Sequence, residues 1–104
     1  AYFCNDETYA KKIENLNKEK LRCWRLPLYS PYLFKIKSQV ADLSNASLDG
    51  MAGSITAALF LQEFLKSPNI PWFHFDTFAW SQDSKGAALQ GLDIMSDFLR
   101  KNFN

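Results

Sequence analysis

The side chains best suited to chemistry gather in one aromatic stretch, PWFHFDTFAW, at residues 71–80. His74 is the single histidine, and Asp76 follows it by two residues, so in a strand both lie on one face, where they could relay a proton or hold a metal. A lone histidine beside aspartate on an apolar strand is more often a hydrogen-bonded core group. Without a second histidine or a cysteine cluster, a zinc site made by this chain alone is not expected. We therefore assign no catalytic and no metal-binding residue to the chain.

Two other patterns also point away from catalysis. Ser81 follows the aromatic stretch at a strand end, where α/β proteins often place groups that contact ligands, but no glycine elbow surrounds it. Contact with a substrate is possible there, and nucleophilic attack is not favoured. Gly50 and Gly53 in GMAGSITAALFLQEF have neither the spacing of a P-loop nor that of a dinucleotide fingerprint. They favour a chain reversal and close packing at a helix start.

Length and composition bound the function classes. The chain has 104 residues, 47% hydrophobic and 22% charged, which fits one compact domain or part of one. A net charge of +1 gives no basic field for nucleic acid or an anionic membrane, and no apolar run approaches the roughly 20 residues of a membrane span. We expect a cytoplasmic protein with no nucleic-acid and no membrane partner. Cys4 and Cys23 favour free thiols, and the sequence leaves open whether they pair.

The spacing of apolar residues predicts six elements in the order strand, helix, helix, helix, strand, helix. Asn5 or Asp6 is expected to cap the first helix, whose apolar positions run to Leu21. Ser30 and Pro31 are expected to start a second helix that extends to Val40. The other elements are a helix over 54–65 buried on more than one side, an inner strand over 71–80 and a last helix with an apolar stripe of Leu89, Leu92, Leu99, Met95 and Phe98. This alternation predicts an α/β fold.

Four blocks of the sequence carry a resemblance that covers essentially the whole chain. They are WRLPLYSPY at 24–32, SQVADLSN at 38–45, GSITAALFLQEF at 53–64 and WFHFD at 72–76. In order and approximate spacing they resemble the C-terminal part of the leucine aminopeptidase family, cytosolic metallopeptidases with two divalent metals. Within these blocks we interpret Trp24 as a packing residue, and Asp42 and Asn45 as loop hydrogen-bonding residues.

The resemblance implies a fold and a limit on the chemistry. Residues 1–104 are expected to be an incomplete domain, the C-terminal fragment of a mixed-sheet, helix-flanked, three-layer metallopeptidase catalytic domain. The family holds its two metals, zinc or manganese, with residues upstream of this part, and its N-T-D-A-E-G-R segment does not occur here. The full-length enzyme would remove N-terminal residues from peptides as a homohexamer, whereas this fragment would bind no metal and be inactive. The alternative is a non-catalytic structural or interaction module.

The resemblance also implies where the substrate lies. Family members line the pocket for the first side chain of the substrate with residues just beyond the H-x-D strand, which correspond here to Phe78, Ala79 and Ser81. Where many members continue H-L-D-I-A-G, this chain has HFDTFAW, so the side chains at this point are bulkier. The preferred N-terminal residue is therefore left open. A fragment of this kind is also expected to expose aromatic surface and a strand edge.

Overall fold

The computed structural model describes residues 1–20, 22–47, 49–78 and 91–103. Its elements follow the predicted order: β1 (Tyr2–Cys4), α1 (Glu7–Asn17), the 3-10 helix η1 (Ser30–Ile36), α2 (Gly53–Gln62), β2 (Phe73–Phe75) and α3 (Leu92–Phe103). No helix among these residues is long and apolar enough to cross a membrane.

A small mixed sheet lies at the centre of the structure. β1 pairs with β2 in antiparallel register, with Tyr2 opposite Phe75 and Cys4 opposite Phe73. On its other side Tyr2 forms a parallel bridge with Arg25: the backbone N–H of Tyr2 donates to Trp24 at 2.8 Å, and the N–H of Leu26 donates to Tyr2 at 2.9 Å. β1 is thus the inner strand, and the predicted mixed sheet is confirmed.

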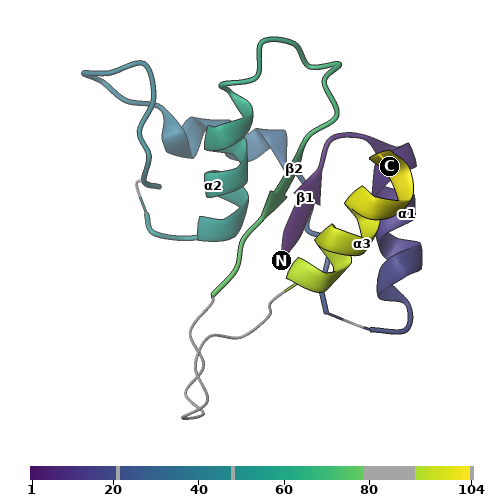
Figure 1. Ribbon diagram of the computed structural model, residues 1–104. Coiled ribbons are helices and arrows are strands. Elements are labelled where there is room, and N and C mark those ends of the chain that lie inside the picture. Colours follow the sequence, from purple (N-terminus) through teal and green to yellow (C-terminus); the bar gives the residue numbers. More distant parts are fainter. Residues whose placement is uncertain (21, 48, 79–90, 104) are drawn as a thin grey trace.

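Helices cover both faces of this sheet, which gives three layers (Figure 1). α1 and α3 lie on one side, and η1 and α2 lie on the other. Because side chains alternate along a strand, Tyr2 and Cys4 point to the first side and Phe3 to the second. Tyr2 and Cys4 belong to a buried core with Ala10, Ile13, Ile94 and Phe98. The predicted α/β, helix-flanked fold is therefore present.

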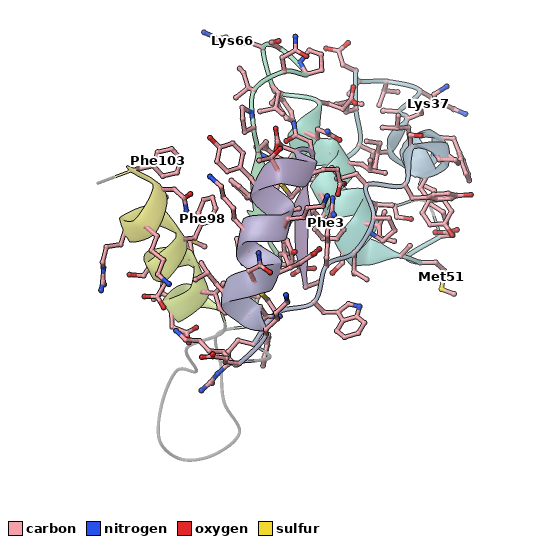
Figure 2. The ribbon with its side chains drawn as sticks, turned by 90° about the vertical axis from the view of Figure 1, so that its right-hand side faces the viewer. Phe3, Lys37, Met51, Lys66, Phe98 and Phe103 are labelled. Carbon is pink, nitrogen blue, oxygen red and sulfur yellow. The ribbon has the colours of Figure 1, made fainter. Side chains whose placement is uncertain are left out.

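α1 and α3 pack through an aromatic cluster. The ring of Tyr9 on α1 lies 5.9 Å from that of Phe98 and 6.3 Å from that of Phe103, measured between centroids. Phe98 points from α3 toward α1 (Figure 2). The predicted stripe of α3 is confirmed at Phe98, which is buried, and is wrong at Leu92 and Leu99, which are exposed; Ile94, outside the predicted stripe, is buried. Leu89 lies outside the described residues.

The first helix starts where the sequence predicts and ends early. Asp6 is its cap, and its Oδ1 accepts a hydrogen bond from the N–H of Tyr9 at 3.0 Å. The helix ends at Asn17 rather than near Leu21. The side chain of Asn17 gives the reason, because its Oδ1 accepts from the N–H of Arg22 at 2.7 Å and its Nδ2 donates to the carbonyl of Cys23 at 2.6 Å. These bonds stabilise a turn in place of another helical turn.

The second predicted helix is shorter and of another type. η1 ends at Ile36, and Val40 is 98% exposed, so the expected stripe through Val40 is wrong. The hydroxyl of Ser38 accepts from the N–H groups of Val40 and Ala41 at 3.2 and 3.0 Å, which forms a local turn that ends the helical path. Pro31 lies in the first turn as expected, but the capping position is Tyr29, whose side chain makes no cap bond.

Several packing predictions also need correction. β2 covers three half-buried residues and is paired on one side only within the described chain, so the predicted long inner strand is wrong over 71–78; residues 79 and 80 lie outside the described chain. Trp24 is 77% exposed and does not pack in the core. α2 buries Thr56, Ala58 and Leu59 on one side, while Leu61 is exposed. Within the described chain α2 packs mainly against η1.

The glycines before α2 act through their backbone and not through close contacts. Gly50 has φ +68°, as a chain reversal requires, so this part of the prediction is confirmed. A Cβ added at Gly50 or Gly53 would meet nothing within 4 Å, so the predicted close packing is wrong.

Candidate functional site

His74 and Asp76 share one face of the sheet, as predicted, but they are held by different neighbours. The imidazole of His74 stacks on Phe3, with 5.9 Å between centroids, and on Trp72, with 6.0 Å. The register places His74 opposite Phe3 on β1. His74 is half-buried and is held by ring stacking, so the predicted hydrogen-bonded core histidine is not what the described residues show.

Asp76 is held by its backbone and by its side chain. Its N–H donates to the carbonyl of Ala1 at 3.0 Å, and the nitrogen of Ala1 donates to the carbonyl of Asp76 at 3.1 Å. These two bonds continue the β1–β2 ladder by one residue. The hydroxyl of Ser54, in the first turn of α2, donates to Oδ2 of Asp76. Sequence analysis missed Ser54, because nothing in the spacing relates it to a residue 22 positions later.

The predicted substrate-contacting residues begin directly after this point. Thr77 and Phe78 leave the sheet, and Phe78 is 68% exposed. Ala79 and Ser81 lie outside the described residues. Phe78 lies two residues after Asp76, whose backbone is hydrogen-bonded to Ala1 at the end of β2. The grouping of Phe78 with Ala79 and Ser81 stays a prediction.

The described residues do not form a centre for two metal ions. Among them, no three or more histidine, cysteine, aspartate or glutamate side chains come together as ligands would. His74 is stacked between aromatic neighbours, and the carboxylate of Asp76 is engaged by Ser54. Zinc and manganese sites need several such donors converging on one point, so this donor set does not fit.

A cavity among the described residues lies at the other end of β1. It has a volume of about 690 Å³ and is lined by residues that include Cys4, Glu7, Arg25 and Leu59. Arg25 fills one wall, with Nη1 and Nη2 donating to the Glu7 carboxylate at 3.0 and 2.5 Å and Nη2 donating to the carbonyl of Cys4 at 3.3 Å. The hydrogen bond from Arg25 lowers the pKa of Glu7. This pair joins the start of α1 to the segment beside β1, so its role is structural.

The two cysteines are free thiols, Cys4 buried and Cys23 half-buried. Burial raises the pKa of both thiols. The parallel bridge between Tyr2 and Arg25 offsets the two cysteines by four positions, or about 13 Å along the strands. A disulfide needs Cα atoms within about 7 Å, so this register keeps the thiols apart.

Helices on both faces of a small mixed sheet define the described chain as an α/β structure. Comparison with known proteins gives the family. The sequence profile described as "Cytosol aminopeptidase family, catalytic domain" matches residues 1–95, and the chain belongs to this family. The resemblance found in the sequence is confirmed. This family is one of metallopeptidases, which generally have two metal ions.

Individual relatives agree with this assignment. A protein named "Probable cytosol aminopeptidase" from Cenarchaeum symbiosum is 41% identical over 92% of this chain and 22% of its own length. Another of that name from Chlorobium luteolum is 40% identical over 95% of this chain and 20% of its own length. The chain thus spans about a fifth of the length of these relatives.

Solved structures confirm the fold. The crystal structure of a cytosol aminopeptidase from Coxiella burnetii superposes with a TM-score of 0.87 and 39% identity, over 99% of this chain and 24% of that one. A tomato leucine aminopeptidase mutant superposes with a TM-score of 0.82 and 29% identity, over 97% of this chain and 20% of that one.

Proposed function

We propose that this chain is the C-terminal section of the catalytic domain of a leucyl-type metalloaminopeptidase, which hydrolyses N-terminal residues from peptides. One observation carries the proposal: almost the whole chain superposes on a cytosol aminopeptidase, at a TM-score of 0.87. The family match over residues 1–95 supports the same activity for the protein that contains this section.

The chain contributes structure to this enzyme and not its metal centre. Two divalent ions, zinc or manganese, bind residues outside these 104, and when bound they activate a water molecule and polarise the peptide carbonyl. The described residues supply a sheet covered by helices on both faces and an ordered end of β2. Alone, the chain is inactive.

The part of the chain that meets the substrate begins after Asp76. Phe78, Ala79 and Ser81 line the pocket for the first side chain of the peptide. The position of Phe78 supports this, because its side chain is 68% exposed directly beyond the end of β2. The whole enzyme is a cytoplasmic homohexamer, a proposal that rests on the family resemblance and on the relatives' name of cytosol aminopeptidase.

Hydrolysis of leucine p-nitroanilide tests the proposal. We expect the full-length protein, loaded with manganese or zinc, to release p-nitroaniline and to lose this activity with a chelator. We expect the 104-residue chain alone to show no turnover under the same conditions. Turnover by the isolated chain would contradict the assignment of the metal centre to residues outside it.

The alternative, a non-catalytic structural or interaction module, has its own outcome in this assay. It would be favoured if the full-length protein bound metal and folded but hydrolysed no amino-acid anilide. A chimaera gives a matched control: the Coxiella burnetii enzyme with its corresponding section replaced by these 104 residues is expected to stay active, because the two sections share a fold at 39% identity.

A further inference from the structure

We propose that Lys35 and Asp49 form a latch that holds the turn before α2 in a strained conformation. With the latch closed, Ala52 stays in the left-handed region of backbone conformation. With the latch broken, the turn opens while the helices and the sheet remain folded. The turn therefore has two states, and one ion pair selects between them. This inference goes beyond the proposed function and does not depend on it.

Lys35 is a buried lysine in the last turn of η1. Its side chain is 9% exposed, and its Nζ lies 5.0 Å from the ring centroid of Tyr32 and 5.8 Å from that of Phe34. A buried ammonium group needs a partner, because an unpaired charge away from water is costly. The carboxylate of Asp49 is that partner, with Nζ donating to Oδ2. The side chain of Asp49 is 51% exposed, so one member of the pair is buried and the other is in contact with water.

The same carboxylate organises the turn that follows it. Oδ1 of Asp49 accepts a hydrogen bond from the hydroxyl of Ser47 at 2.7 Å and another from the N–H of Met51 at 3.0 Å. The bond from Lys35, followed by those from Ser47 and Met51, lowers the pKa of Asp49, so the carboxylate stays charged. The side chain of Met51 points outward (Figure 2), so its packing does not fix the turn. The latch thus joins η1 to the chain directly before α2.

Ala52 carries the strain in this turn. It has φ 58° and ψ 39°, and it is the only non-glycine residue of the described chain with a positive φ. This left-handed region is unfavourable for a residue with a Cβ atom, and such strain persists only where the surrounding contacts fix the conformation. On the helix side, the carbonyl of Ala52 accepts from the N–H of Thr56 at 3.0 Å. On the other side, the bonds of Asp49 supply the contacts.

Loss of the Lys35 ammonium group opens the latch and leaves the packing around it in place. In Lys35→Met, a flexible apolar side chain keeps the contact with the two aromatic rings. The carboxylate of Asp49 then turns to water, the turn is no longer tied to η1, and Ala52 relaxes out of the left-handed region. Replacing Asp49 would instead leave the buried ammonium group unpaired and destabilise the fold more generally. Lys35→Met is therefore the variant that opens the latch alone.

Hydrogen exchange of the full-length protein, followed by mass spectrometry, tests the latch. In Lys35→Met we expect the amides of residues 49–56 to exchange about tenfold faster and those of α1 to be unchanged. Lys37→Met is the matched control, because Lys37 is an exposed lysine two residues further along the chain, and it is expected to leave both regions unchanged. Adding Ala52→Gly to Lys35→Met is expected to slow the exchange again, because glycine adopts the left-handed conformation without strain.

Each outcome decides the proposal. Unchanged exchange over residues 49–56 in Lys35→Met would overturn it. Faster exchange over the whole protein would also overturn it, because the pair is then a general stabilising contact and not a local latch. Should Lys35→Met not fold, Ala52→Gly alone decides the question: we expect about threefold slower exchange over residues 49–56, and equal or faster exchange would show that the turn holds no strain. None of these measurements uses catalytic activity, so they are independent of the proposed function.

Discussion

Phe78 is the residue of the proposed pocket that the structure describes, and it is the place to test substrate preference. We predict that Phe78→Ala in the full-length protein raises kcat/KM for phenylalanine p-nitroanilide relative to alanine p-nitroanilide by about tenfold. Changes of this size in kcat/KM are typical when a hydrophobic pocket gains or loses part of a side chain. The physical reason is volume, because replacing the ring of Phe78 with a methyl group enlarges the proposed pocket.

A second exposed aromatic residue provides the control for this prediction. Phe34 lies on η1, is exposed like Phe78, and is not part of the proposed pocket. Phe34→Ala is expected to leave the relative kcat/KM values unchanged. Equal effects of the two substitutions would show that Phe78 acts on general stability and not on the substrate.

Three ion pairs predict how stability depends on pH. The hydrogen bond from Arg25 lowers the pKa of Glu7, the bond from Lys20 lowers that of Asp97, and the bond from Lys35 lowers that of Asp49. For a carboxyl group with a lowered pKa, the stabilising contribution is complete above its unfolded pKa and is lost as the pH falls through its folded pKa.

We therefore predict that the urea midpoint of the 104-residue chain is constant above about pH 5 and decreases below it, since unfolded carboxyl groups titrate near pH 4. In Arg25→Ala we expect a lower midpoint at neutral pH and a shallower decrease in acid, because the Glu7 pair no longer contributes. Circular dichroism measures both. Parallel pH profiles for the two proteins would contradict a role of this pair.

At the level of single elements, the cap of α1 gives a direct stability prediction. Asp6→Ala removes the acceptor for the N–H of Tyr9, which lies 3.0 Å from Oδ1. We expect a loss of about 1 kcal/mol in the free energy of unfolding, as for other capping residues. Thermal unfolding of the 104-residue chain measures it, with Asp42→Ala, an exposed loop substitution, as the control. Equal stability of Asp6→Ala and the unaltered chain would show that this cap does not contribute.

The sequence predicts the order and type of most elements, because these depend on local signals. The Asp6 cap, the proline at the start of η1 and the reversal at Gly50 each act through their own backbone or the next turn. Element ends are less well predicted. Asn17 and Ser38 end helical segments through side-chain hydrogen bonds to nearby backbone groups. The spacing of apolar residues alone predicts that both helices continue further.

The candidate site could be found in part only. The H-x-D pair and the residues after it are visible in the sequence through the family resemblance. The bond from Ser54 to Asp76 is not, because it depends on how α2 lies against the end of β2. The exposure of Trp24 is likewise a property of the surroundings and not of the residue, so its interpretation as a packing residue is wrong for this structure.

For the molecule as a whole, the arrangement of layers leaves apolar surface uncovered. The expected exposure of aromatic residues is confirmed: large apolar side chains are exposed in several elements, among them Trp24, Phe34, Val40, Met51, Phe64 and Phe103. The described chain also pairs β2 on one side only. Proteins that are stable as monomers seldom combine an unpaired strand edge with this much exposed apolar surface.

These features predict that the 104-residue chain associates with itself when it is produced alone. The net charge of +1 offers little repulsion between copies, and the outer edge of β2 has backbone groups available for pairing with another strand. Sedimentation velocity is expected to show a weight-average mass that rises with protein concentration. A double variant, Trp24→Ser with Phe64→Ser, removes two rings that are 77% and 66% exposed, and its mass is expected to rise less. A strictly monomeric species at high concentration in the unaltered chain would contradict the idea that these surfaces are normally covered, since apolar area and an open strand edge drive association wherever they are accessible.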